Sequence, residues 1–194
     1  VAFGQLEPAV SFAGSRGAYL SALGAKNIAL KVTNIDKLEV VISKVYESNL
    51  LAAHRYGYYP NTRNEDDDEG YYDEYSGGDA SLGDIIFRQE IDTRSLPQAN
   101  GSRLYNFNFT DKLPDNKGSY HIQVRSKKDY WVSDSRFVSL SDIGLIAKEG
   151  KDKIIVFANS LQSALPLAGV NVIAYGANNQ VLGMGSTDVD GVAG

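Results

Sequence analysis

The chain has 194 residues, of which 43% are hydrophobic and 22% are charged, and it contains no Cys. The hydrophobic share is enough for one or two globular cores and excludes a wholly disordered protein. Without Cys the chain holds no disulfide framework, no Cys-ligated metal site and no thiol nucleophile, and its net charge of −5 argues against a nucleic-acid partner.

Short segments with alternating apolar and polar residues dominate the chain. In the first of them, Ile28, Leu30 and Val32 alternate with polar or small neighbours. Such alternation places one set of side chains on a core face and the other set in solvent. We predict strands over 28–33, 38–45, 84–91, 105–110, 120–125, 143–148, 153–159, 170–175 and 180–186. One helical turn is predicted over 50–54, and no segment has the pattern of a longer amphipathic helix.

Turn signals rich in Asn, Asp and Gly separate these strands, at 34–37, 114–118, 148–152 and 176–179. Many short strands without intervening helices predict an all-β protein built from antiparallel β-sandwich domains. One strand pattern ends at Val138 and the next starts after Asp142. We therefore expect two domains, 1–139 and 140–194. The second is expected to be truncated at its C-terminus, because a new apolar run begins after the last turn.

An acidic, tyrosine-rich insert interrupts the first domain at about 54–82. Eight acids and no Lys or Arg lie between Glu65 and Asp79, and half of the 12 tyrosines lie between Tyr56 and Tyr75. Outside this window the bases outnumber the acids, so the net negative charge of the chain comes from this one segment. The run at 65–69 lacks the carboxylate spacing of a calcium loop. A solvated loop is the main interpretation, and a cation-binding or partner-docking loop is the alternative.

Few residues carry the signals of a chemical site. The Asp-Val-Asp-Gly segment at 188–191 could suggest calcium, but it lacks the downstream Glu of an EF-hand and fits a tight β-turn. His54 and His121 are isolated from any second His, which favours structural roles, and Trp131 is predicted to be a core or interdomain anchor. There is no nucleophile elbow, phosphate loop or zinc-protease helix motif. We predict no enzyme activity and no catalytic, cofactor-binding or metal-binding residue.

Five segments after residue 140 resemble, in the same order, a macroglobulin-like domain of the bacterial alpha-2-macroglobulin family. They are Ser-Asp-Ile-Gly-Leu at 141–145, the strand at 154–161, Pro-Leu-Ala-Gly-Val-Asn-Val at 166–172, Asn-Gln-Val-Leu-Gly at 179–183 and Thr-Asp-Val-Asp-Gly at 187–191. Leu165 stands where the family usually has Gly or Lys. The earlier segments 15–20, 28–32, 34–46 and 118–124 are similar to the preceding part of the same proteins, so the resemblance leaves out little besides the insert.

The resemblance implies macroglobulin-like sandwiches of the immunoglobulin or fibronectin-III kind. They would be scaffold domains of a large protease inhibitor of the periplasm or cell envelope, a protease trap whose parent carries a lipid anchor. A Cys–Gln thioester of that parent cannot lie in this chain. The implied partners are other domains of the same chain and, through the full-length protein, target proteases. The residues that it marks are structural: Ser141, Asp142, Gly144, Pro166, Gly169, Asp188, Asp190 and Gly191.

A different class of function stays open from the residues themselves. Tyrosines such as Tyr56 and Tyr75 around the insert could stack on sugars, because aromatic faces are good platforms for sugar rings. The alternative function is therefore a surface adhesion or carbohydrate-binding module of two sandwich domains.

Overall fold

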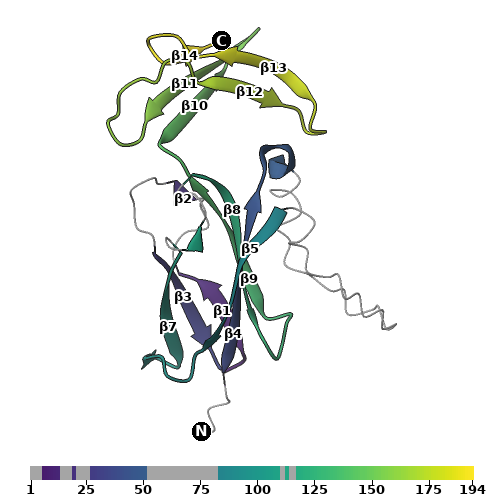
Figure 1. Ribbon diagram of the computed structural model, residues 1–194, viewed down its shortest axis with the longest axis vertical. Helices are drawn as coiled ribbons and strands as arrows, with labels where there is room; N and C mark the ends of the chain where they lie inside the picture. Colours follow the sequence, from purple (N-terminus) through teal and green to yellow (C-terminus); the bar gives the residue numbers. More distant parts are fainter. Residues whose placement is uncertain (1–5, 14–18, 21–26, 52–82, 110–111, 114–116) are drawn as a thin grey trace. The chain divides into compact units, whose positions relative to one another are not determined.

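The computed structural model describes residues 6–13, 19–20, 27–51, 83–109, 112–113 and 117–194. Contacts between Cα atoms divide the chain into two compact units, with the main boundary between Ser139 and Leu140 (Figure 1). We call them the first and the second unit. The acidic insert and His54 lie outside the described residues.

The first unit contains two antiparallel sheets. The four-stranded sheet has the order β1 (Ala9–Phe12), β3 (Asn27–Thr33), β7 (Ser102–Asn108) and β6 (Gln98–Ala99). The five-stranded sheet has the order β2 (Tyr19–Leu20), β9 (Ser133–Leu140), β8 (Gly118–Ser126), β4 (Lys37–Val45) and β5 (Gly83–Asp92). β3 alternates in burial as the sequence predicts, and the all-β, antiparallel fold class is confirmed.

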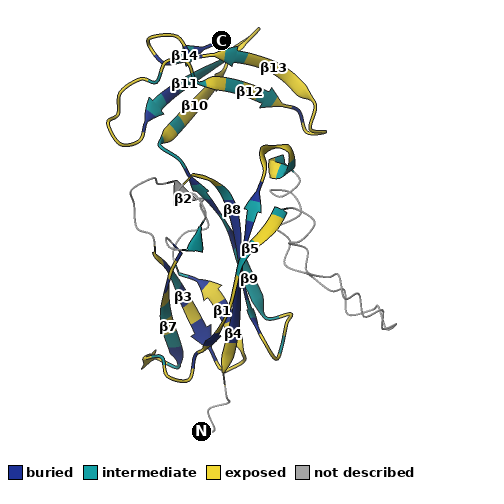
Figure 2. Ribbon diagram, in the orientation of Figure 1, coloured by how far each residue is buried: buried dark blue, intermediate teal, exposed yellow. Residues whose placement is uncertain are grey.

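The core of the first unit lies between these two sheets. Ile28, Leu30 and Val32 of β3 are almost fully buried, as the alternation predicts (Figure 2). The facing set comes from β4, β8 and β9: Leu38, Val40, Ile42, Tyr120, Ile122, Val124 and Val138. Each such side chain stabilises the fold by about 1.5–3 kcal/mol through its removal from water, so this layer is the main source of stability.

The other face of β4 is buried as well, which the alternation does not predict. Glu39, Val41 and Ser43 point away from the core between the sheets, yet each is buried. β4 is the strand between β8 and β5, so side chains of both neighbours extend over it. His121 of β8, expected in solvent, is buried for the same reason and lies opposite Ser43, with its ring 4.8 Å from that of Phe137.

The second unit has a three-stranded and a two-stranded sheet. The first has the order β10 (Ile143–Glu149), β11 (Ile154–Ser160) and β14 (Val192–Ala193), and the second pairs β12 (Asn171–Tyr175) with β13 (Val181–Ser186). Many of its apolar side chains are exposed, among them Leu145, Ile146, Ile173, Leu182 and Met184.

The 3-10 helix η1 (Glu47–Asn49) directly follows β4, and residues 50 and 51 continue as helix. The helical turn predicted over 50–54 is therefore confirmed for these two residues, and residues 52–54 lie outside the described part of the chain. The short strands β1, β2, β6 and β14 are not among the predicted ones, because two to four residues carry too little alternation to be recognised.

Candidate functional site

The outer face of the five-stranded sheet carries the densest charged cluster of the described residues. Its centre is Glu39 of β4, whose side chain is only 4% exposed. Arg125 of β8 binds one of its carboxylate oxygens through both Nε (2.6 Å) and a terminal guanidinium nitrogen (2.5 Å). Arg88 of β5 lies 3.8 Å from the other oxygen. The buried carboxylate is thus held by cations from both neighbouring strands.

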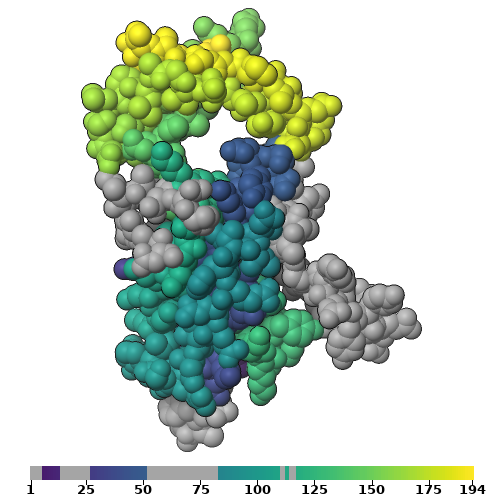
Figure 3. Space-filling view, viewed as in Figure 1, coloured from purple at the N-terminus to yellow at the C-terminus, as the bar shows by residue number. Residues whose placement is uncertain are grey.

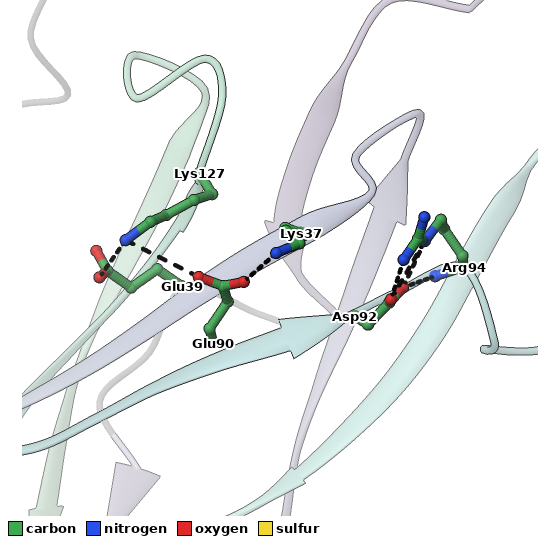
Figure 4. A network of polar contacts seen from close by, with 6 residues as sticks. All are labelled: Lys37, Glu39, Glu90, Asp92, Arg94 and Lys127. Atoms are coloured by element: carbon green, nitrogen blue, oxygen red, sulfur yellow. Dashed lines mark hydrogen bonds and ion pairs between the residues drawn. The ribbon is translucent and has the colours of Figure 1, made fainter.

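Strand register explains why a third cation is needed. Glu39 lies directly opposite Glu90 of β5, and like charges at such a position repel each other. The Nζ of Lys127 lies 3.5 Å from Glu39 and 4.0 Å from Glu90, between the two carboxylates (Figure 4). Lys37 binds Glu90 from the other side at 2.7 Å. Cations therefore offset the repulsion that the register creates. We call these six residues, Lys37, Arg88, Arg125, Lys127, Glu39 and Glu90, the sheet-face network.

The pKa values of the network show which interactions dominate. Burial would raise the pKa of Glu39, but the hydrogen bond from Arg125 and the charges of Arg125, Lys127 and Arg88 lower it below its ordinary value. The hydrogen bond to Glu90 raises the pKa of Lys37. Nearby, hydrogen bonds from Arg94 hold the pKa of Asp92 well below its usual range (Figure 4).

Replacing Glu39 with Gln is expected to lower the free energy of unfolding by about 1–3 kcal/mol at neutral pH, because the half-buried Arg125 loses its counter-charge. Since the pKa of Glu39 is lowered on folding, its contribution is complete above its ordinary pKa of 4.5 and is lost as the pH falls through the lowered value. The difference between the two proteins in urea unfolding should therefore shrink in acid.

Glu90→Gln is the matched control, because its exposed pair with Lys37 contributes less than about 1 kcal/mol. Equal effects of the two substitutions, or a difference for Glu39→Gln that does not change between neutral and acidic pH, would contradict the central role of Glu39.

Trp131 and His121 are the other aromatic residues that the sequence singled out and that lie in the described part of the chain. Trp131 follows β8 and is 65% exposed, so the prediction that it is a core residue is wrong, and an interdomain role stays a prediction. His121 has a structural place against Phe137. Within the described ranges no group of three or more His, Asp or Glu side chains is arranged to hold a metal ion, and no helix there is long and apolar enough to cross a membrane.

The marked residues at the start of the second unit form a hydrogen-bonded junction. Ser141 Oγ accepts a hydrogen bond from the Ile143 N–H at 2.9 Å. The Asp142 carboxylate accepts one from Ser160 Oγ (2.9 Å) and one from the Gln162 N–H (3.0 Å). Gly144 leaves room for Leu161, because an added Cβ would lie 2.7 Å from the Leu161 side chain. The Ser-Asp-x-Gly motif therefore holds the start of β10 against the end of β11.

The marked residues at the end of the unit close a tight turn. Asp188 Oδ1 accepts hydrogen bonds from the backbone N–H of Asp190 (3.0 Å) and of Val192 (2.9 Å), and the Gly191 N–H donates to the Asp188 carbonyl at 3.0 Å. Gly191 has φ +73° and its carbonyl accepts from the Ala158 N–H at 2.8 Å. The β-turn prediction is thus confirmed. Nothing in the structure explains why position 190 carries a carboxylate, since only the backbone N–H of Asp190 takes part in the turn.

A third set of contacts joins the turn at Gly169 to the end of β13. Gly169, at φ +73°, donates its N–H to the Thr187 carbonyl at 2.8 Å. Thr187 Oγ1 donates to the Leu167 carbonyl at 2.6 Å and accepts from the Val170 N–H at 2.9 Å. Pro166 forms a bridge with Asn159 of β11. Gly169 and Thr187 therefore form their hydrogen bonds with backbone atoms of the second unit.

Sequence reasoning missed the sheet-face network. The one signal available was an acid within the otherwise apolar strand 38–45, at the position of Glu39. Its partners Arg88, Arg125 and Lys127 come from segments 49 or more residues away, and only the pairing of β4 with β5 and β8 brings them together.

Comparison with known proteins gives a consistent result. A family model described as the bacterial alpha-2-macroglobulin MG3 domain matches residues 140–194. An alpha-2-macroglobulin homolog from Yersinia pestis is 28% identical over 190 residues, which cover 91% of this chain and 9% of that protein. The chain therefore spans about a tenth of the length of this relative.

The fold matches solved structures over almost the whole chain. A crystal structure of native alpha-2-macroglobulin from Escherichia coli spanning domains NIE-MG1 is similar with a TM-score of 0.68 and 17% identity, over 96% of this chain and 86% of that one. A structure spanning domains MG0-NIE-MG1 of the same protein is similar with a TM-score of 0.65 and 19% identity, over 97% of this chain and 57% of that one. A crystal structure of a Salmonella alpha-2-macroglobulin mutant is similar with a TM-score of 0.61 and 17% identity, over 100% of this chain and 11% of that one.

Proposed function

Because this chain belongs to the bacterial alpha-2-macroglobulin family, we propose that its two units are scaffold domains of a protease inhibitor. The parent protein acts as a protease trap in defence of the bacterial periplasm or cell envelope, where a lipid anchor holds it. The units take no part in catalysis. Their partners are other domains of the same polypeptide and, through the full-length protein, the target proteases.

The use of the motif residues in the second unit is the observation that carries this proposal. Both carboxylate oxygens of Asp142 accept hydrogen bonds from residues of the unit, and Asp188 Oδ1 accepts two from the following turn. A carboxylate that accepts hydrogen bonds from its own unit in this way holds the local backbone in place. The residues that the family resemblance marks therefore support a scaffold role.

The exposed apolar residues of the second unit also support contacts with more of the same polypeptide. Ile173 and Met184 are paired across β12 and β13 on one face of that hairpin, and both are exposed. Leu145 and Ile146 are exposed on opposite faces of β10. Exposed apolar side chains that lie side by side, such as Ile173 and Met184, are suited to contact with a further domain.

Incubation of the full-length protein with a panel of proteases tests the proposal. We expect cleavage of the protein, faster migration of the cleaved form in native electrophoresis, and loss of the protease's activity on protein substrates. Cleavage that neither compacts the protein nor inhibits the protease would contradict it.

A pair of glycine variants in the full-length protein tests the scaffold role of this segment. Gly191→Ala, which crowds the backbone of the second unit, should reduce inhibition in step with its loss of folded structure. Gly183→Ala is the control, because its new Cβ meets nothing within 4 Å. Inhibition that stays unchanged while Gly191→Ala unfolds the second unit would show that the unit is not part of the working scaffold.

The carbohydrate-binding or adhesion alternative rests on Tyr56–Tyr75, which lie outside the described residues, and it stays a prediction. Binding on a glycan array that disappears when this segment is deleted would favour it over the scaffold role.

A further inference from the structure

The turn between β8 and β9, residues 127–132, presents two large aromatic side chains to solvent. Tyr130 is 56% exposed and Trp131 is 65% exposed. Their ring centroids are 5.4 Å apart, and the ring planes meet edge to face at 76°. We call this segment the hairpin tip; it joins β8 to β9 at the lower right of Figure 1, and in Figure 3 the green atoms of this part of the chain project from the first unit.

Backbone hydrogen bonds hold the hairpin tip in place. The Val132 N–H donates to the Asp129 carbonyl at 2.8 Å, and the Ser126 N–H donates to the Val132 carbonyl at 2.9 Å. The Asp129 N–H donates to Ser126 Oγ at 3.1 Å, and the Lys127 N–H donates to the Lys37 carbonyl at 3.0 Å. Because the tip is already ordered, binding through it loses little conformational entropy.

Cations lie on the tip and beside it. Lys127 belongs to the sheet-face network, and the neighbouring Lys128 is exposed and makes no ion pair with any residue in the described ranges. The charged groups on the tip or linked to it through Lys37 and Lys127 include the cations Lys37, Arg88, Arg94, Arg125, Lys127 and Lys128 and the carboxylates Asp36, Glu39, Glu90, Asp92 and Asp129. Glu39, Glu90 and Asp92 already have a cation partner. The charges on the tip that make no ion pair with the described residues are the exposed Lys128 and the half-buried Asp129.

This combination fits an anionic bilayer surface better than a sugar. Two rings at 76° do not form one flat platform for a sugar ring. Trp and Tyr are the residues enriched at membrane–water interfaces, because each ring has an apolar body and a polar group. A Lys beside anionic lipid contributes about 1 kcal/mol of attraction. We propose that the hairpin tip binds the headgroup region of an anionic phospholipid bilayer, with Trp131 and Tyr130 among the headgroups and Lys128 against lipid phosphates.

This inference goes beyond the scaffold role and does not depend on it. Trp131 is the only Trp of the chain, so its fluorescence reports on the tip alone. With vesicles of equal parts phosphatidylglycerol and phosphatidylcholine, we expect a blue shift of its emission and protection from acrylamide. Vesicles of phosphatidylcholine alone should bind more weakly, and salt should weaken binding to the anionic vesicles.

Vesicle sedimentation with variants assigns the binding to the tip. Trp131→Ala and Tyr130→Ala should each bind about tenfold more weakly, since each loses a large apolar side chain. Lys128→Gln should bind about fivefold more weakly. The controls are Leu104→Ala, at an exposed leucine of β7, and Lys31→Gln, at an exposed lysine of β3, and both should bind like the unchanged protein.

Several results would overturn the proposal. One is no co-sedimentation with anionic vesicles and no change in Trp131 emission. Another is unchanged binding by the tip variants, which would point to the exposed apolar side chains of the second unit, such as Met184. A response to soluble oligosaccharides without a response to vesicles would assign the tip to glycans. Circular dichroism checks the fold of every variant, and Tyr130→Ala keeps Trp131 as a reporter if Trp131→Ala does not fold.

Discussion

Replacing Gly191 with alanine is expected to destabilise the second unit by about 2–5 kcal/mol, as the combined effect of a left-handed backbone and a steric clash. Gly191 has φ +73°, and a Cβ at this position would lie 2.6 Å from the Ala158 carbonyl oxygen and 3.0 Å from Pro166. That same oxygen accepts the Leu167 N–H at 2.9 Å. The new methyl group must therefore displace the closing turn from β11.

Two other glycines separate the causes of this effect. Gly169 has the same φ of +73°, but its added Cβ would meet nothing within 4 Å, so Gly169→Ala should show only the backbone cost of about 1–2 kcal/mol. Gly183→Ala, with neither a positive φ nor a close neighbour, should be nearly neutral. Hydrogen exchange of the β11 amides measures all three. Equal effects at Gly191 and Gly169 would show that the clash is relieved at no cost.

Replacing Phe107 with alanine is expected to lower the free energy of unfolding of the first unit by about 3–5 kcal/mol, the usual cost of emptying a buried phenylalanine site. Phe107 is 1% exposed in β7. Its ring lies 6.1 Å from Phe87 of β5, so this contact links the four-stranded sheet to the five-stranded sheet. The ring of Tyr105, on the same strand, lies 6.4 Å from the ring of Phe107.

Leu104→Ala on the same strand is the control, because Leu104 is 55% exposed and should change stability by no more than about 0.5 kcal/mol. Urea unfolding followed by circular dichroism and hydrogen exchange in β3 and β8 measures the loss. A cost at Phe107 no larger than that at Leu104 would show that the two sheets do not depend on this contact.

The site differs from the fold in how much of it can be predicted. Asp142, Gly144, Asp188 and Gly191 act within turns and adjoining strands of one small unit. The turn at Asp188–Gly191 follows from the residues themselves, whereas the structural roles of Asp142 and Gly144 follow from the family resemblance. The sheet-face network joins residues from three strands, and its existence depends on sheet order. The exposure of Trp131 depends on which surfaces the rest of the chain covers, and no local pattern contains that information.

By itself, the sequence determined that the protein is all-β, where most of its longer strands run and where several of its turns lie. A period of two assigns side chains to two faces, and Ile28, Leu30 and Val32 follow it. Only the tertiary structure decided that Glu39 and His121, on the nominally solvent face, are buried. The physical reason is that burial on the outer face of a sheet comes from long side chains of neighbouring strands, and strand order is set by pairing between segments that are distant in the chain.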